Sequence, residues 1–428
     1  MTLDWATGDL TATRFPAHGA ALREGGAAFL TSAFRRWGAL AAGDAVEQIT
    51  RLQECQGGST GRKLLLDVRY RAADAEPPRE LFVKFSRDFS DPARDHGRAQ
   101  MAPEVRFALL CRDGSLPIAV PRPLFADYHH ATGTGILITE RIAFGRNGIE
   151  PQHAKCRDYE LADPIAHYRA LFTALGALAG ADQAGRLAAS PADFPVRVDP
   201  GSVGVPPALT PERLHRRLER FAAFAADYPA LLPAGLASPA FTARLAAQVP
   251  ALAARAGDIW RVLASRPELI ALCHWNANVD NAWFWRDATG TLRCGLLDWG
   301  SVSRLNLAMA VWGSLCSAET DVWDHHLDEL LTLLADTVAR AGGARLPVPT
   351  LRDHALLYGA VMGITWLLDV PALVRHRVPA TVTGRDDPRI RDDETVRVRL
   401  QMLVNVCNLL HRHDILDIAA RNAVPVVR

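Results

Sequence analysis

The residues best suited to chemistry are polar side chains that follow two apolar segments in the second half of the chain. One group is the octapeptide 274–281, HWNANVDN, and the other is Asp298, which follows the apolar run 292–297. The turn residues 287–290, DATG, predict a β-hairpin between them. This apolar hairpin should place Asn281 and Asp298 at the edge of one buried site. An amide and a carboxylate there would offer hard oxygen atoms to a bound ligand or cation.

Lysine is rare in this chain and occurs only at Lys63, Lys84 and Lys155, whereas arginine supplies the other basic residues. We expect lysine to persist where a compact ammonium is needed that a planar guanidinium cannot imitate. Lys84 lies within the apolar strand-like segment 81–85, LFVKF. A lysine at a sheet edge could merely extend its charged end into water. The rarity of lysine favours a functional role for Lys84 instead.

The periodicity of apolar residues changes along the chain. Up to residue 142 it predicts a small antiparallel β-rich lobe, with helices at 22–40 and 102–111 and strands at 46–55, 63–70, 81–85, 123–128 and 135–140. Residues 143–428 predict a larger, mainly helical lobe, with helices at 165–181, 211–226, 241–263 and 305–316 and onward to the end. The apolar run 355–368 is too short to span a membrane and predicts a buried helix. Residues 375–399 are interpreted as a solvated connection.

The octapeptide and the segment 296–300, LLDWG, resemble motifs of the aminoglycoside phosphotransferase and choline/ethanolamine kinase families, including their ecdysteroid-kinase-like relatives. In those families the loop reads His-x-Asp-x-x-x-x-Asn, and a later strand ends in an Asp followed by an aromatic residue. The resemblance covers residues 45 to 320 approximately. It implies an α+β, two-lobed protein kinase-like fold and an ATP- and Mg²⁺-dependent phosphotransferase that acts on a hydroxyl of a small molecule.

The resemblance also implies roles for single residues. His274 corresponds to the structural histidine of the loop, and Asn281 and Asp298 to the metal ligands. Lys84 would pair with the α- and β-phosphates, and Glu104 on the following helix would hold its ammonium in place. The segment 56–61 would be the glycine-rich hairpin over the phosphates, through Gly57, Gly58, Ser59, Thr60 and Gly61. The segment 138–142, with Glu140 and Ile142, resembles the hinge whose backbone meets the adenine.

Asn276 departs from the family pattern, which has an Asp at this position to accept the proton of the substrate hydroxyl. Asparagine cannot take a proton, although its carbonyl oxygen can orient a hydroxyl. Loss of a general base costs on the order of 10² to 10⁴ in rate, but a loose phosphoryl transition state makes little demand for early deprotonation. Asp280 is either a substitute base or a loop-stabilising residue. The alternative function is therefore a catalytically weak or inactive nucleotide-binding pseudokinase, and a third is nucleotidyl transfer at the same metal site.

Residues 57–61, GGSTG, also fit the Gly-x-Ser-x-Gly pattern of hydrolase nucleophile elbows. An elbow needs a helix after the serine, whereas 63–68 continues as a strand. No Gly-Lys-Ser/Thr closes the segment, so it is not a Walker A loop either. Both hydrolase and P-loop functions are disfavoured.

The amino-acid composition argues against several classes of binding partner. The 48 Lys and Arg residues nearly balance the 47 Asp and Glu residues, which argues against nucleic-acid binding. The seven cysteines are dispersed and never in a CxxC pair, as expected for buried thiols in a reducing cytoplasm. The N-terminus lacks a signal-peptide pattern, and no membrane partner is expected. Residues 187–265 contain no acidic run, which argues against a polycationic aminoglycoside as substrate.

Overall fold

The computed structural model describes residues 3–55, 60–72, 76–112 and 114–424. The chain forms two compact units. Unit 1 comprises Met1–Pro151, Gly185–Pro195 and Gly295–Ser303, and unit 2 comprises Gln152–Ala184, Val196–Cys294 and Arg304–Arg428. Unit 1 therefore contains Asp298, whereas unit 2 contains the octapeptide 274–281.

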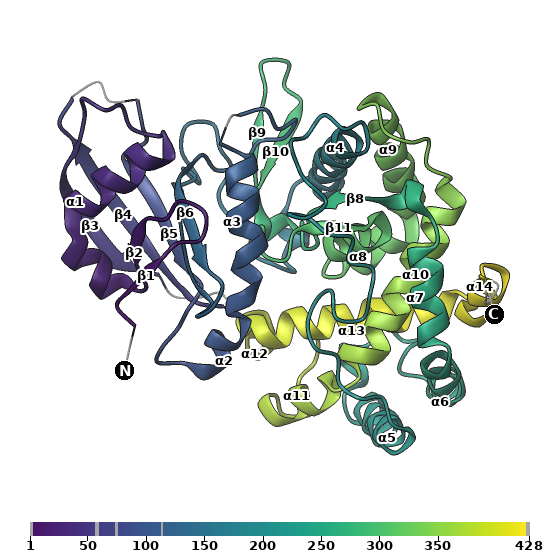
Figure 1. Ribbon diagram of the computed structural model, residues 1–428. Helices are drawn as coiled ribbons and strands as arrows, with labels where there is room; N and C mark the ends of the chain where they lie inside the picture. Colours follow the sequence, from purple (N-terminus) through teal and green to yellow (C-terminus); the bar gives the residue numbers. More distant parts are fainter. Residues whose placement is uncertain (1–2, 56–59, 73–75, 113, 425–428) are drawn as a thin grey trace. The chain divides into compact units, whose positions relative to one another are not determined.

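Unit 1 is built on a five-stranded antiparallel sheet in the order β3-β4-β5-β7-β6 (Figure 1). Its strands are β3 (Val46–Glu54), β4 (Arg62–Tyr70), β5 (Glu80–Phe85), β6 (Pro123–His129) and β7 (Thr134–Glu140). A small hairpin of β1 (Trp5–Thr7) and β2 (Arg14–Pro16) precedes it, and the helices are α1 (Gly19–Trp37), α2 (Pro92–His96) and α3 (Met101–Leu110). The antiparallel β-rich region expected from the alternating apolar pattern is confirmed.

The two faces of this sheet carry different residues. Leu64, Val83 and Ile138 lie opposite one another in neighbouring strands and belong to the buried apolar cluster that includes α1. Their neighbours along each strand point to the opposite face, because side chains alternate along a strand. That second face, on the side of α3, carries Lys84 and Leu137, which lie opposite each other in β5 and β7. The face that carries Lys84 supports the candidate site, and Leu137 on this face also belongs to the buried cluster, so both faces contribute to the core.

Unit 2 is mainly helical (Figure 1). Its α-helices are α4 (Pro164–Gln183), α5 (Pro211–Asp227), α6 (Pro239–Ala254), α7 (Ala256–Ala264), α8 (Leu307–Leu315), α9 (Leu327–Arg340), α10 (Val348–Met362), α11 (Val370–Arg377), α12 (Pro388–Arg391), α13 (Glu394–Arg412) and α14 (Ile415–Arg421). The short strands β8 (Ile270–Cys273) and β11 (Ser303–Asn306) pair with each other, as do β9 (Ala282–Arg286) and β10 (Leu292–Leu296). The hairpin predicted around residues 287–290 is confirmed.

Several helices begin with the same local signal, a capping residue followed by proline. The side chains of Asp163, Thr210 and Ser238 each accept a hydrogen bond from a backbone N–H of the first turn of α4, α5 and α6. Proline follows each of them at the first helical position, where its missing N–H would have no helical partner in any case. These starts are therefore determined locally.

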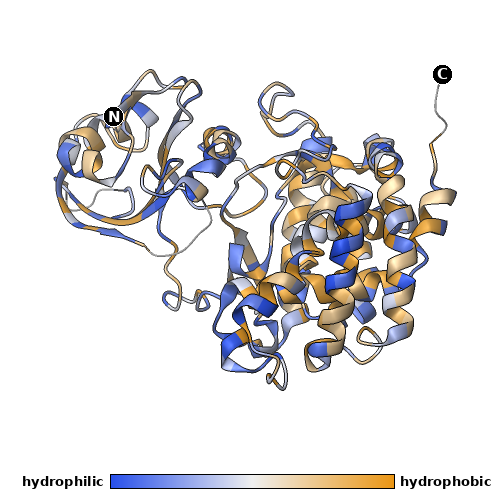
Figure 2. Ribbon diagram, turned by 90° about the horizontal axis from the view of Figure 1, so that it is seen from below, coloured by the Kyte–Doolittle hydropathy of each residue, from blue (hydrophilic) through white to orange (hydrophobic). Residues whose placement is uncertain are grey.

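The segment 355–368 is buried, as predicted, except for Trp366, and most of it lies in α10 and the π-helical turn Gly363–Leu367 that follows. Hydrophobic residues dominate many of the helices of unit 2 (orange in Figure 2). Among the described residues, no single helix has the length and apolarity to cross a membrane, although the bent pair Val348–Leu367 and Val370–Arg377 meets both criteria together.

Two predictions were wrong, one about the length of a helix and one about a segment expected to be a connection. Residues 241–263 form two helices instead of one, because the chain leaves helical geometry at Arg255, whose N–H bonds to Leu252 only three residues back. Residues 375–399 are not merely a connection, since α13 begins at Glu394 after Asp393 caps it by accepting from the N–H of Val396. The high density of charge in that segment masked the cap signal.

Candidate active site

The centre of the site in unit 1 is the ammonium group of Lys84. Its Nζ donates to Oε2 of Glu104 at 2.7 Å and to Oδ1 of Asp298 at 2.5 Å. The side chains of Lys84 and Glu104 are only 9% and 4% exposed, whereas that of Asp298 is 38% exposed. The three residues that the sequence singled out from β5, α3 and the segment after β10 therefore meet at one point.

Electrostatics keep this lysine charged. Burial alone would lower the pKa of Lys84, but the carboxylates of Asp298 and Glu104 outweigh burial and raise it. Burial raises the pKa of Glu104, against the opposing charge of Lys84. Burial lowers the pKa of Lys63, with Asp298 opposing this change and Lys84 adding to it. A cation on the sheet face is thus held between two carboxylates, only one of which is accessible to solvent.

The turn that carries Asp298 is held against α3. The indole of Trp299 stacks on Phe107 of α3 with ring centroids 3.8 Å apart, and the N–H of Ser301 donates to the carbonyl of Gln100 at 3.2 Å. Trp299 is 4% exposed, so its ring is part of the buried core. One helix therefore places both carboxylates around Lys84.

Asp298 itself has a left-handed backbone conformation, with φ of 64°. Such conformations cost free energy for residues other than glycine, although Asp tolerates them better than most. Strained residues of this kind are concentrated at functional sites, where the surrounding structure enforces them. This feature has no signal in the sequence, and it turns the Asp298 carboxylate toward Lys84.

The glycine-rich segment is only partly described. Gly57, Gly58 and Ser59 lie outside the described residues, whereas Thr60 and Gly61 lie within them. Gly61 has φ of 55°, and a Cβ there would come within 1.9 Å of the carbonyl oxygen of Phe85. Its own carbonyl accepts from the guanidinium of Arg94, at 2.7 Å from Nη2. The base of the hairpin therefore needs glycine at this position because the adjacent strand approaches closely.

The predicted hinge segment 138–142 begins within the last residues of β7 and continues beyond this strand. The side chain of Glu140 accepts from the N–H of Arg122 at 2.9 Å, while its own N–H donates to the carbonyl of Arg122 at the same distance. Ile142 is half-buried and lies beyond the strand. The Glu140 carboxylate thus joins the ends of β6 and β7, and the N–H of the next residue, Arg141, donates to the carbonyl of Glu80 at 3.0 Å.

The octapeptide in unit 2 forms a compact loop held by its own side chains. His274 is 1% exposed, and its Nδ1 accepts from the N–H of Asn276 at 3.0 Å, so the proton of a neutral ring is on Nε2. Nδ2 of Asn281 donates to the backbone carbonyl of Asn276 at 2.9 Å. His274 is therefore buried within the loop and bonded to it, and Asn281 is anchored through its nitrogen, which leaves its Oδ1 for a hard cation.

Asn278, which the sequence did not single out, orients Asn276. Its Nδ2 donates to Oδ1 of Asn276 at 2.5 Å, and its own Oδ1 accepts from the hydroxyl of Ser317 at 2.7 Å. Asn278 is 1% exposed. The only signal in the sequence was its place within the octapeptide. Because Asn278 requires an acceptor at the tip of residue 276, either an amide or a carboxylate fits there.

Asp280 and the third lysine of the chain lie near each other in unit 2. Burial alone would lower the pKa of Lys155, but the charge of Asp280, followed by the thiols of Cys316 and Cys156, raises it. The Asp280 side chain is half-buried. Asp280 is therefore a carboxylate with a cation near it, which is compatible with either of its predicted roles.

Gly313 of α8 is a further residue that sequence reasoning missed. A Cβ there would lie 1.5 Å from the carbonyl oxygen of Trp275 and 2.7 Å from its carbonyl carbon. We expect Gly313→Ala to displace the loop and to lower the free energy of unfolding by about 1–3 kcal/mol, despite the better helix propensity of alanine. Urea denaturation measures this change. Gly257→Ala in α7, where a Cβ meets nothing within 4 Å, is the matched control and should be neutral or stabilising. Equal stability of both variants would contradict the close approach.

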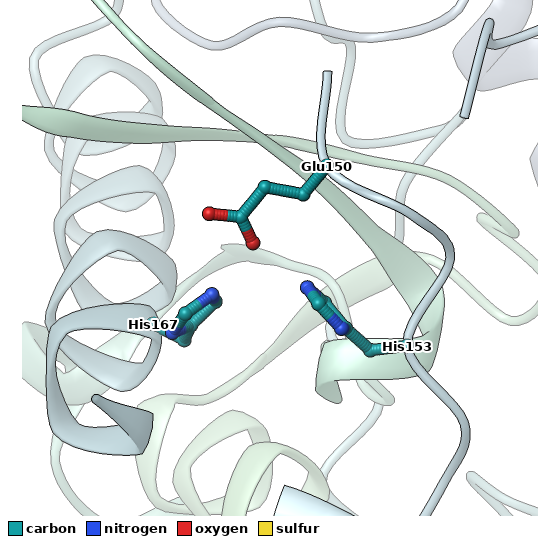
Figure 3. A group of neighbouring side chains, drawn as sticks. All are labelled: Glu150, His153 and His167. Carbon is teal, nitrogen blue, oxygen red and sulfur yellow. The ribbon is translucent and has the colours of Figure 1, made fainter. Parts of the chain in front are cut away.

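An aromatic cluster in unit 2 supports β9. The rings of His153 and His167 meet edge to face with centroids 5.2 Å apart, and that of His167 lies 4.7 Å from Phe284 of β9. Figure 3 shows the two imidazoles of this cluster. Nδ1 of His167 lies 2.8 Å from the carbonyl of Asp163 and donates to it, which orients the ring. The cluster packs on the strand that directly follows Asn281.

Comparison with known proteins finds relatives by structure. No protein-family model and no curated protein sequence matches the chain. A choline/ethanolamine kinase family protein from Mesorhizobium loti is 17% identical, with 91% of this chain and 97% of that chain covered and a TM-score of 0.37. A microcompartment-associated aminopropanol kinase is 12% identical, covering 87% and 94%, with a TM-score of 0.42. The choline kinase of Cryptosporidium parvum is 11% identical, covering 84% and 91%, with a TM-score of 0.40.

These three structures are of the kind that the sequence resembles. Because these TM-scores lie below 0.5, the functional proposal rests on the residues of this chain alone.

Proposed function

We propose that the protein is an ATP- and Mg²⁺-dependent phosphotransferase that acts on a hydroxyl group of a small molecule. The observation that carries this proposal is the contact of the Lys84 ammonium with both Glu104 and Asp298. A buried carboxylate that positions a lysine, beside a solvent-accessible carboxylate, fits the needs of phosphoryl transfer, which are phosphate positioning and charge stabilisation.

The sheet face around Lys84 suits a nucleotide. Leu65 and Phe82 lie opposite each other in β4 and β5, two residues along the strands from the lysine, and both are half-buried. Two residues of a strand span about 6.6 Å. If the adenine of ATP lay over this apolar pair, the phosphates of ATP would point toward Lys84. The edge of the adenine would then face the backbone after β7. This apolar pair therefore supports the proposal of ATP binding independently of the glycine-rich segment.

The residues present also fit Mg²⁺. Asp298 offers a carboxylate and Asn281 an amide oxygen whose nitrogen is already bonded, and both are hard oxygen donors. Magnesium, when bound, would neutralise charge on the phosphate oxygens. The carboxylate of Asp298 and the ammonium of Lys84 already form a pair of opposite charges that can serve both a cation and a polyphosphate.

Asn276 has an orienting role in this proposal. Its Oδ1 accepts from Asn278 with one lone pair, and the second lone pair can accept from the acceptor hydroxyl. In the transfer, the hydroxyl oxygen forms a bond to the terminal phosphorus, the bond from that phosphorus to the bridging oxygen of ADP breaks, and the hydroxyl proton leaves to water or to the product phosphate. Nucleotide binding without turnover would favour the pseudokinase alternative.

A ligand-binding measurement tests the nucleotide site first. ATP at about a hundredfold its dissociation constant should stabilise the fold by about 2.7 kcal/mol, or about 3 °C for a chain of this length, if it binds only the native state. The measurement is a thermal-shift series with ATP, ADP and adenosine, with Mg²⁺ or with EDTA. We expect ATP with Mg²⁺ to give the largest shift. An ADP-release assay on a panel of hydroxyl compounds then identifies the acceptor, and no shift with any nucleotide would refute the proposal.

A further inference from the structure

Lys63 is a lysine of unit 1 to which the proposed function assigns no role. It lies directly opposite Lys84 in the antiparallel pairing of β4 and β5, and opposite residues of such a pair point to the same face of the sheet. That face also carries the apolar pair Leu65 and Phe82. Lys63 therefore shares the candidate nucleotide face with Lys84.

We propose that Lys63 is a second phosphate-binding cation of this site and that it contacts the polyphosphate of the nucleotide beside Lys84. The inference rests on the proposed function and deepens it, because it predicts that affinity depends on the number of phosphates.

The pairing of two lysines is unfavourable unless a ligand or a set of acids compensates it. Like charges directly opposite each other destabilise a sheet. Lysine occurs at only three positions in this chain, yet two of them form this one cross-strand pair. The carboxylates of Glu104 and Asp298 both contact Lys84. A purely structural role would not call for a second ammonium at this position.

The contacts of the two lysines differ. Lys84 has two carboxylate partners, whereas within the described part of the chain the Lys63 ammonium makes no hydrogen bond or ion pair. The Lys63 side chain is half-buried, so its charge is not simply extended into bulk water. An ammonium with unused donors, on the same sheet face as a paired one, is ready to bind an anion.

The backbone holds Lys63 at the base of the glycine-rich hairpin. Its carbonyl accepts from the N–H of Cys55 at 2.9 Å, across the pairing of β3 and β4. Two residues before Lys63, the carbonyl of Gly61 accepts a hydrogen bond from the guanidinium of Arg94. The strand is therefore constrained on both sides of Lys63, which limits the positions its side chain can reach to this end of the sheet face.

The test is isothermal titration of ATP, ADP and adenosine, each with Mg²⁺, into the full-length wild type and Lys63→Met. Methionine keeps most of the apolar stem and removes the charge. We expect ATP affinity to fall about ten- to a hundredfold, as for loss of a charge-assisted hydrogen bond, with a smaller loss for ADP and none for adenosine. Lys63→Arg should recover part of the ATP affinity, because it restores the charge with a different geometry.

The matched control is Arg69→Met, which removes one charge from the same strand at a side chain that is 56% exposed. It should bind ATP as the wild type does. If Lys63→Met also binds ATP as tightly as the wild type, the role of Lys63 is refuted while the nucleotide site stands. If Lys63→Met loses adenosine and ATP affinity equally, Lys63 is a packing residue and the inference is refuted. If the wild type binds no nucleotide, the proposed function fails and the inference fails with it.

Discussion

The double variant Lys84→Met/Glu104→Gln should lose nucleotide-dependent stabilisation and at least about 10³-fold of phosphotransferase activity, because positioning and charge stabilisation supply most of the catalysis in phosphoryl transfer. Lys84 is the residue in contact with both candidate carboxylates. Thermal shift with ATP and Mg²⁺ and an ADP-release assay measure the two losses. A double variant is needed because Lys84→Met alone leaves Glu104 as a buried unpaired carboxylate, which costs about 3–5 kcal/mol of stability.

The variant Asp298→Asn distinguishes the contribution of Mg²⁺ to the ATP-dependent thermal shift from the contribution of the phosphate contacts. Asparagine tolerates the left-handed φ of 64° at this position, so the turn should be retained. We expect this variant to keep part of the shift with ATP in EDTA and to lose the additional shift with Mg²⁺. A folded double variant that retains the full ATP shift, or an Asp298→Asn variant with unchanged Mg²⁺ dependence, would contradict the assignment of the site.

The second large effect is expected from Asn276→Asp, which should raise phosphoryl transfer or background ATP hydrolysis by about tenfold or more. The carboxylate would accept from Asn278 with one oxygen, as the amide does now, and would leave the other oxygen to take a proton. The loop should therefore keep its geometry. Initial rates of ADP release at saturating ATP and Mg²⁺ measure the change.

The control for this exchange is Asn147→Asp, the same substitution at an exposed position of unit 1, which should leave the rate unchanged. If Asn276→Asp lowers the rate of a wild type that turns over quickly, the amide is the better orienting group or Asp280 is the base. Asp280→Asn then distinguishes these two roles. If both Asn276 forms bind nucleotide and neither turns over with any hydroxyl compound, the protein is a nucleotide-binding pseudokinase.

Local signals in the sequence were sufficient for most elements. Alternation of apolar residues located the strands around Lys84, and capping residues followed by proline mark the starts of α4, α5 and α6. These signals act within a few residues, so no tertiary contact is needed to interpret them. The break at Arg255 was missed because apolar periodicity continues across it and the weakened hydrogen bonding there has no signature in residue type.

The sequence by itself determined which residues could do chemistry, because rare side chain types stood in local patterns. A lysine within an apolar strand, an acid on the next helix and the polar octapeptide were visible without any structure. Only the tertiary structure decided that Asp298 reaches Lys84, through the stacking of Trp299 on Phe107 and a left-handed backbone. It also decided that Lys63 is the cross-strand neighbour of Lys84, and that Asn278 orients Asn276. These relations depend on strand register, on packing between distant segments and on hydrogen-bond direction, which are properties of the folded chain and not of its local composition.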